Sequence, residues 1–186
     1  FMIVGSLPFV LYLQFARGKA SSLFLDSQVL AFFTILLVSV ILCVLYIQNN
    51  ADISSADSIR KSLFNVTSIL TGTGYVSADY MEWGPFIVSL FFILMLIGGC
   101  AGSTSCGLKV FRVQILYKQV IIQTKKIAFP DAVLVPLYNG KEIPENVSKA
   151  VTSFFLLFIL SFVIIGLVLS LLGLDLITAF SASASA

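Results

Sequence analysis

Five consecutive residues offer the clearest coordination chemistry in this sequence. They are Thr71-Gly72-Thr73-Gly74-Tyr75, which combine glycines of wide backbone freedom with threonine hydroxyls that act as oxygen acceptors. Such a loop can turn its carbonyls toward a common axis, and a ring of carbonyls replaces the hydration shell of a potassium ion. One loop supplies about a quarter of that cage, so four related loops are needed. We expect potassium at Thr71, Gly72, Thr73 and Gly74, with Tyr75 packed behind the loop; a plain glycine-rich turn is the alternative.

A second glycine-rich segment interrupts an apolar stretch and reads Gly98-Gly99-Cys100-Ala101-Gly102-Ser103-Thr104-Ser105-Cys106-Gly107. Without large side chains it cannot form a lipid-facing helix, so we expect a broken helix inside a bundle. Three interpretations compete. The spacing of Gly98 and Gly102 fits a helix-packing motif, and a nucleotide-binding loop would need a Gly-Lys-Ser/Thr sequence after a strand, which is missing. We favour the third, a flexible gate within the membrane beneath the ion site.

Long apolar stretches must position both segments. Ranges 27–51, 84–108 and 150–174 contain no Asp, Glu, Lys or Arg, and each exceeds the roughly 20 apolar residues that a membrane-spanning helix needs. Residues 1–16 look like the end of a further span. With 59% hydrophobic and 11% charged residues and a mean hydropathy of +1.05, the chain is predicted to be an all-α polytopic membrane protein.

The composition excludes several functions. The absence of histidine removes histidine catalysis, haem ligation and most zinc sites. A net charge of +2 without a dense basic patch argues against nucleic-acid binding, and three cysteines cannot form a disulfide scaffold. The spans lack the ionisable residues that membrane catalysis uses. We therefore expect no enzyme and no covalently bound cofactor, with potassium as the transported ion.

Basic residues are distributed unevenly between the connections. Range 52–83 has two, Arg60 and Lys61, whereas 109–149 has seven. Because cytoplasmic loops of membrane proteins carry excess Lys and Arg, 109–149 is expected in the cytoplasm and 52–83 outside. Asp79 and Glu82 are then expected near the outer mouth of the ion pathway. They either concentrate cations there or are ordinary solvated loop charges. The seven basic residues of range 109–149 are Lys109, Arg112, Lys118, Lys125, Lys126, Lys141 and Lys149.

A short helix is predicted just before Thr71. Ser54 is a good N-cap and Asp57 makes a capping-box-like start. Apolar residues then recur at helical spacing for about 16 residues, too few and too polar at the start for a span. A short helix, a glycine-rich turn and a return to the same side describe a re-entrant pore loop. An amphipathic helix on the outer surface is the alternative. The periodic residues are Ile59, Leu63, Val66 and Leu70.

The cytoplasmic connection has two predicted pieces and precedes a repeat of the earlier pattern. Range 108–127 reads as a basic amphipathic helix, and Asn139-Gly140 between short apolar runs predicts a hairpin. Asp175 follows its span as Asp57 follows the first one. We divide the chain into the end of a preceding repeat (1–26), a complete helix–pore-loop–helix repeat (27–127), a hairpin linker (128–149) and the start of the next repeat (150–186), as in an internal fragment of a longer chain.

These motifs together resemble one family. The Thr71–Tyr75 segment followed by Asp79 and Trp83, the glycines, Ser103 and Thr104 of 98–107 followed by Lys109, and Gly-Leu-Asp at 173–175 are similar to the Trk/Ktr superfamily of bacterial potassium uptake proteins, specifically its Trk-type membrane subunit. The resemblance implies four helix–pore-loop–helix repeats of a potassium-channel-like fold in the plasma membrane. It also implies a homodimer of the full-length chain and a cytosolic nucleotide-binding regulatory subunit.

The resemblance also assigns the two glycine segments. Thr71–Tyr75 corresponds to the third filter of the family, with Gly74 its characteristic glycine, and is called the filter segment below. Range 98–107 corresponds to the gate and is called the gate loop, with Gly98, Gly99, Gly102, Ser103, Thr104 and Gly107 as its residues. Cys106 stands where the family usually has glycine. A non-conducting membrane scaffold or subunit and a sodium-selective relative are the alternative functions.

Overall fold

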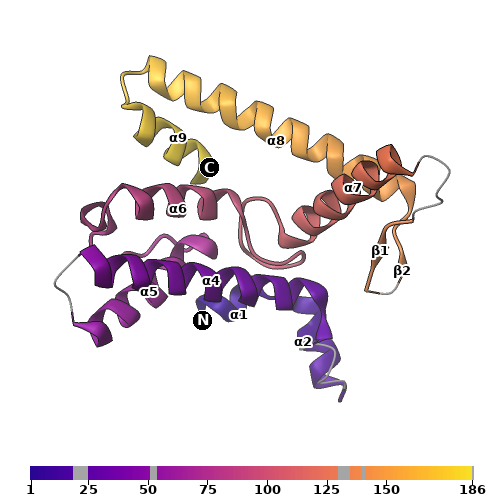
Figure 1. The fold of residues 1–186 in the computed structure, drawn as a ribbon, viewed down its shortest axis with the longest axis horizontal. Coiled ribbons are helices and arrows are strands. Elements are labelled where there is room, and N and C mark those ends of the chain that lie inside the picture. Colours follow the sequence, from indigo (N-terminus) through magenta and orange to yellow (C-terminus); the bar gives the residue numbers. More distant parts are fainter. Residues whose placement is uncertain (19–24, 51–53, 130–134, 140, 186) are drawn as a thin grey trace.

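The structure is a computed structural model that describes residues 1–18, 25–50, 54–129, 135–139 and 141–185. Helices make up nearly all of its ordered elements, which confirms the all-helical prediction (Figure 1). In chain order the helices and strands are α1 (Met2–Ser6), α2 (Phe9–Ala16), α4 (Ser27–Asn50), α5 (Ser55–Leu70), the 3-10 helix η1 (Tyr80–Trp83), α6 (Pro85–Leu96), α7 (Val110–Ala128), β1 (Leu137–Tyr138), β2 (Lys141–Glu142), α8 (Glu145–Leu171) and α9 (Leu176–Ser185).

Within the described part of the chain, two helices are long and apolar enough to cross a membrane. They are α4 with 24 residues and α8 with 27. Range 84–108, the second of the three predicted spans, is divided where the sequence predicts a broken helix: α6 is apolar but has only 12 residues, and the chain leaves the helix until α7 begins at Val110. The break falls on the glycine-rich segment, where glycines at a helix end permit conformations that other residues resist.

The start of α8 differs from the prediction. The absence of charge placed the span at 150–174, whereas the helix begins at Glu145 directly after Pro144. Proline has the backbone φ that a helix start requires, and Pro144 forms the N-cap. The charged residues Glu145 and Lys149 form a 2.8 Å ion pair one turn apart, so the first turn of the helix accommodates them.

The first sixteen residues also differ from expectation. They form α1 and α2 rather than one continuous helix end, because Leu7 has an extended backbone with ψ 157°. Pro8 follows Leu7, and a proline disfavours the helical conformation of the residue before it. The segment around Leu7 is buried and contacts the core, so this break belongs to the packed interior.

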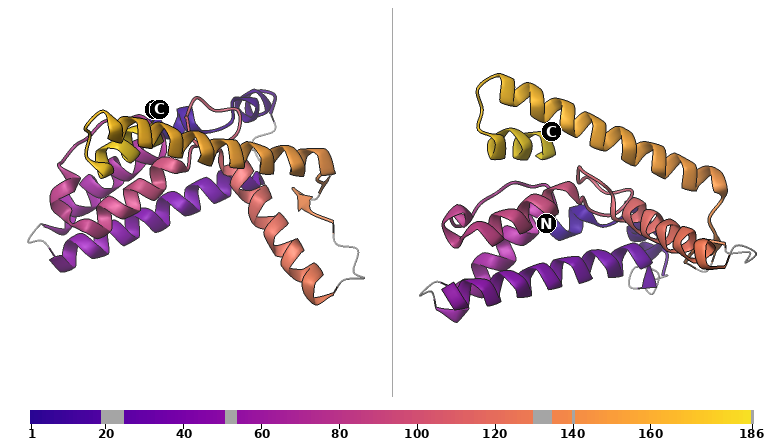
Figure 2. Two further views of the ribbon diagram at one scale, coloured as in Figure 1. Left: turned by 90° about the horizontal axis from the view of Figure 1, so that it is seen from above. Right: turned by 45° about the horizontal axis from the view of Figure 1, so that its top comes forward.

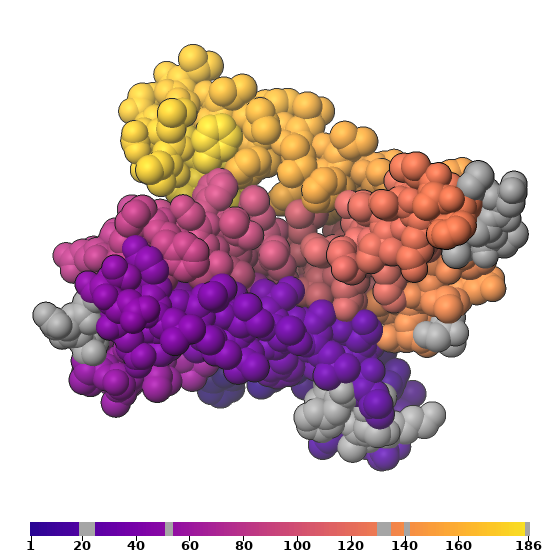
Figure 3. Space-filling view, in the orientation of Figure 1, coloured from indigo at the N-terminus to yellow at the C-terminus, as the bar shows by residue number. Residues whose placement is uncertain are grey.

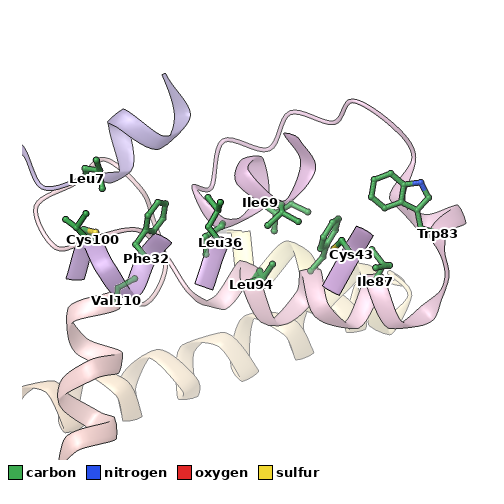
Figure 4. Packing of buried hydrophobic residues seen from close by; sticks show 14 of the residues in the cluster. Leu7, Phe32, Leu36, Cys43, Ile69, Trp83, Ile87, Leu94, Cys100 and Val110 are labelled. Carbon is green, nitrogen blue, oxygen red and sulfur yellow. The ribbon is translucent and has the colours of Figure 1, made fainter. Parts of the chain in front are cut away.

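A single apolar core joins α4, α5 and α6. Figure 1 shows α4 and α5 side by side with α6 next to them. Each contributes a large, fully buried side chain to the core: Phe32 from α4, Leu70 from α5 and Phe91 from α6. In Figure 4, Leu36, Ile69 and Leu94 meet between the three helices. Because α5 packs against both α4 and α6, its C-terminal end has a fixed position.

The last two helices form a separate layer. α8 and α9 pack antiparallel over α6, and α9 lies between α8 and α6 (Figures 1 and 2). Phe162 of α8 contacts Phe180 of α9 and Phe92 of α6, with ring centroids 5.5 and 6.2 Å apart. Figure 3 shows these helices as a band along one edge, and only 6% of the apolar window of α8 is buried within the described chain.

The predicted hairpin is present. β1 and β2 pair antiparallel, with Leu137 opposite Glu142, and Asn139 takes a left-handed backbone conformation with φ 47°. The Tyr138 ring packs edge-on against Phe111 of α7, with centroids 4.9 Å apart. Burial raises the pKa of the Tyr138 phenol above its ordinary value. Residues 130–134 and Gly140 of the predicted linker, like 19–24, 51–53 and 186, lie outside the described residues.

Candidate functional site

Helix α5 delivers the filter segment into the interior. Its first turn is capped as predicted, because the Ser54 hydroxyl accepts a 3.4 Å hydrogen bond from the N–H of Asp57. The Asp57 carboxylate does not complete a capping box; it pairs with Arg60 at 3.1 Å instead. One face of α5 is buried over its whole length, so the helix ends inside the fold at Leu70. The negative end of the helix dipole therefore points into the filter segment, where it favours cations.

The filter segment is bonded to the last turn of α5. The Thr71 N–H donates to Thr67 O at 3.0 Å, which prolongs the helix by one bond. The N–H groups of Thr73 and Gly74 both donate to the carbonyl of Ser68, at 2.9 and 3.4 Å. Because these N–H groups point back to the helix, the loop is held close to its C-terminal end while its other side stays open.

Glycine is required here by the backbone. Gly72 and Gly74 have φ values of 70° and 78°, in the left-handed region that side chains disfavour. A Cβ on Gly74 would meet nothing within 4 Å. Conformation rather than crowding is therefore the reason for glycine at this position.

The side chains of the segment divide into two kinds. Thr71 is 6% exposed, and its hydroxyl lies 2.7 Å from that of Thr73 and donates to Ser68 O at 3.3 Å. Tyr75 is 69% exposed and does not pack behind the loop in the described part of the chain, contrary to the expectation. A loop that carries its own hydrogen bonds to α5 does not need that ring as a support.

The chain beyond the filter segment returns along α6. The Ser77 N–H donates to the Asn65 amide oxygen at 3.0 Å. Asp79 caps η1 by accepting from the N–H of Met81 at 2.9 Å, so this carboxylate has a structural role whatever its effect on cations. Trp83 is 8% exposed and packs on Phe91 of α6, which anchors the return (Figure 4).

The gate loop folds back on itself at both ends. Gly98 N–H donates to Leu108 O at 2.8 Å and Leu108 N–H to Leu96 O at 3.0 Å, so the flanks form a short parallel bridge. A Cβ on Gly98 would overlap the carbonyl oxygen of Cys106. This close approach of two backbones requires glycine for lack of space. Gly102 and Gly107 have positive φ, 77° and 82°.

Residues far away in sequence hold the middle of the gate loop. The carbonyl of Gly5 accepts from both the N–H and the hydroxyl of Thr104, at 3.2 and 3.0 Å. The Phe9 N–H donates to Gly102 O at 3.1 Å. Gln28, near the start of α4, accepts from the backbone of the loop at 2.9 Å. The described loop is therefore tied to the N-terminal helices and to α4.

Polar side chains stabilise the loop from within. The Ser105 hydroxyl is buried, accepts from Gly99 N–H at 2.8 Å and lies 2.9 Å from the Ser103 hydroxyl. The Lys109 ammonium donates to the carbonyls of Ser103 and Ser105. The positive charge of Lys109, at the start of α7, thus makes charge-assisted hydrogen bonds with carbonyl oxygens of the gate loop. These contacts hold the gate loop in the described conformation, and its movement as a gate stays a prediction.

The filter segment and the gate loop meet at one cavity of about 110 Å³. It is lined by Gly72 and Gly74 from the filter segment, Cys106 from the gate loop, and residues of α5, α6 and α9. A Cβ on Gly72 would lie 3.8 Å from the N atom of Cys106. Cys106 thus stands directly next to the filter segment, at the position where the resembled family usually has glycine.

Sequence reasoning identified both segments but missed the residues that fix them. Asn65 and Ser105 are small polar residues whose partners lie elsewhere, and no local pattern distinguishes them from other buried serines and asparagines. The Gly5 carbonyl is a backbone atom and has no signature at all. The break at Leu7 could have been found, because Pro8 is a visible signal within an apolar run.

Comparison with known proteins agrees with this geometry. Residues 9–186 match the TrkH family model, described as a cation transport protein. The chain is 39% identical over its whole length to the Trk system potassium uptake protein TrkI of Halomonas elongata, and 32% identical to TrkH of Vibrio parahaemolyticus. It spans 38% and 39% of the lengths of these relatives.

A solved structure shares the fold. The crystal structure of the potassium transporter TrkH from Vibrio parahaemolyticus superposes with a TM-score of 0.92 at 31% sequence identity. The match covers 99% of this chain and 40% of the TrkH chain. The arrangement of α4, α5, the gate loop and α8 is therefore one that a potassium transporter of this kind contains.

Proposed function

The chain belongs to the TrkH family of cation transport proteins, which are transporters rather than enzymes, and from that membership we propose that it contributes one filter segment and one gate to a potassium pathway through the plasma membrane. The proposal concerns the whole protein, because the chain spans 38% of its relatives. Four filter segments would surround the ion, of which Thr71–Tyr75 is one.

One observation carries the proposal: a short helix ends at a loop whose first four N–H groups, those of residues 71–74, all donate back to that helix. Thr73 and Gly74 donate to Ser68 O, and the positive φ of Gly74 reverses the direction of the backbone at that point. Carbonyl oxygens are then free to face away from α5. Together with the negative end of the helix dipole, they favour a dehydrated cation.

Ion movement follows from the same parts. A potassium ion exchanges water for carbonyl and hydroxyl oxygens at Thr71, Gly72, Thr73 and Gly74, and binding must stay weak enough for release. Cys106 of the gate loop lines the same cavity as Gly72 and Gly74, and we expect the loop to obstruct the path on the inner side of this site until it moves. No covalent step is needed, and the chain requires no bound cofactor for this function.

The proposed partners follow from family membership. The lipid bilayer would surround α8, whose apolar window is 6% buried within the described chain. The full-length protein would form a homodimer and bind a cytosolic nucleotide-binding regulatory subunit on the side of α7 and the hairpin. The relatives carry the name Trk system, which supports a protein of several components.

Accessibility of a single cysteine in the filter segment tests the proposal. Cys43, Cys100 and Cys106 are replaced by alanine in the full-length protein, and Thr73→Cys is introduced. A water-soluble thiol reagent applied from outside should modify this cysteine in choline buffer. Potassium should slow the modification and sodium should not. Met81→Cys, on the 59% exposed side chain of η1, is the matched control that should react equally in all buffers.

The other outcomes separate the alternatives. Protection by sodium instead of potassium would indicate a sodium-selective relative. A membrane scaffold predicts no protection by either ion. Reaction from the cytoplasmic side alone would contradict the proposed outer position of the filter segment.

A further inference from the structure

Asn65 of α5 reaches past the filter segment to the chain that follows it. This side chain is 1% exposed, and its Oδ1 accepts the 3.0 Å hydrogen bond from the Ser77 N–H. Twelve residues separate donor from acceptor, so the contact is not part of a local turn. Burying an amide is unfavourable unless it is hydrogen-bonded, which makes this partner the compensation for its burial.

The hydrogen bond between Asn65 and Ser77 joins α5 to the chain just beyond the filter segment. Among the described residues it is the only hydrogen bond between α5 and the backbone of 75–78. Upstream, the Ser68 carbonyl holds the N–H groups of Thr73 and Gly74. The peptide groups of Gly74 and Tyr75 thus lie between two attachments to the same rigid helix, and the segment that could rotate most easily is fixed at both ends.

We propose that Asn65 is a positioning residue for ion selectivity: through Ser77 it fixes the outer end of the filter segment, and with it the direction of the Gly74 and Tyr75 carbonyls. The inference rests on the proposed function, since it concerns the same ion site. Gly74 has φ 78° and no neighbour within 4 Å of a Cβ position, so nothing nearby in the described chain limits its rotation except these attachments. A filter that discriminates by the number of coordinating carbonyls loses selectivity when those carbonyls turn away.

The chemistry of the contact defines the variants. Only the oxygen of the amide is used; Nδ2 has no partner among the described residues. Asn65→Asp keeps an acceptor oxygen at the same place, whether or not it is protonated. Asn65→Leu keeps the volume and removes the acceptor. Ser62→Ala is the matched control, because the Ser62 hydroxyl is buried on the same helix without a described partner.

Two measurements on the full-length protein test the role. Potassium-over-sodium selectivity is measured by flux into liposomes, and amide exchange is measured on the peptide that contains 75–78. For Asn65→Leu, selectivity should fall about fivefold and exchange should accelerate by a similar factor, as expected for the loss of one neutral hydrogen bond. Total cation flux should be retained. Asn65→Asp should restore both properties, and Ser62→Ala should change neither.

A second pair removes the same bond from the exposed side, in case the buried substitution prevents folding. Ser77→Pro deletes the donor N–H, and Ser77→Ala keeps it. Ser77→Pro should lower selectivity as Asn65→Leu does. Unchanged selectivity in both Asn65→Leu and Ser77→Pro overturns the positioning role, as does an equal loss of flux for both ions. A third outcome separates this inference from the proposed function. If the unmodified protein does not prefer potassium, the proposed function is refuted; faster amide exchange in Asn65→Leu would then still support the hydrogen-bond role of Asn65.

Discussion

The filter segment and the gate loop are both rich in glycine, yet different surroundings hold them. The filter segment is bonded to one helix, α5, from which it continues directly. The gate loop is bonded to its own two flanks, to the N-terminal residues around Gly5 and to Gln28 of α4. Gly74 is needed for a backbone conformation and Gly98 for space. Glycine content therefore does not by itself indicate flexibility; the contacts around each glycine determine its role.

The comparison predicts different costs for side chains at the two glycines. Gly98→Val should have the largest effect, because its Cβ must displace the carbonyl of Cys106 and the bridge between Gly98 and Leu108 would separate. Overpacking of this kind should lower the free energy of unfolding by about 3 kcal/mol. Thermal unfolding of the purified full-length protein measures it.

Gly102→Ala is the control within the same loop. Gly102 has φ 77° but open space around its Cβ position, so alanine should cost only about 1 kcal/mol. Equal destabilisation by the two substitutions would show that the close approach at Gly98 is unimportant.

Removal of the gate loop tests whether it obstructs the path. A Cβ on Gly98 would lie 3.3 Å from the carbonyl carbon of Gly107, so a deletion of 99–106 can be closed by joining these neighbours. Potassium flux into liposomes should rise at least about tenfold if the open state is normally a minor one. Selectivity should be retained, because the filter segment keeps its bonds to α5. Unaltered or lower flux in a correctly folded deletion protein would contradict the gating role.

Substitution of the filter glycine should lower ion selectivity in addition to its cost in stability. Gly74→Ser places a side chain on a residue with φ 78°, which costs about 1–2 kcal/mol and shifts the backbone away from its coordinating conformation. The preference for potassium over sodium should fall about tenfold. Gly173→Ala is the matched control, since Gly173 has φ 93°, open space and a place between α8 and α9. Selectivity that survives Gly74→Ser would count against the site.

The smallest effect is expected from Ser105→Ala. This change removes the acceptor of the Gly99 N–H and the contact with the Ser103 hydroxyl, at a cost of about 1 kcal/mol. Ser58→Ala removes a buried hydroxyl without a described partner and should leave the melting temperature unchanged. A melting temperature that falls equally in both proteins would mean that burial, not the loop contact, accounts for the loss.

Local signals in the sequence were sufficient for the elements around the filter segment. The Ser54 cap and the glycines after Leu70 predicted both ends of α5, and Asn139 predicted the hairpin. These features depend on conformational preferences of neighbouring residues, which a sequence displays directly. The ion-coordinating role of the filter segment itself stays a prediction that the experiments above address.

Features that depend on distant partners could not be predicted in the same way. The contacts of Gly5 with Thr104 and of Asn65 with Ser77 join atoms that have no common pattern. The absence of charge predicts a span that begins at residue 150, five residues after the actual start of α8 at Glu145. A search for uncharged residues leaves out Glu145 and Lys149, although these two residues pair with each other at the start of the helix.

The bond between Gly5 and Thr104 has a consequence for biosynthesis. These residues are separated by 99 positions, and a ribosome adds about 5–20 residues per second. The carbonyl of Gly5 therefore exists for about 5 to 20 seconds before its partner is made. During that interval the backbone polar groups at the Leu7–Pro8 break must find water or insertion machinery, because lipid cannot satisfy them. The contact that holds the middle of the gate loop to the N-terminal residues therefore forms only after the chain has been made as far as Thr104.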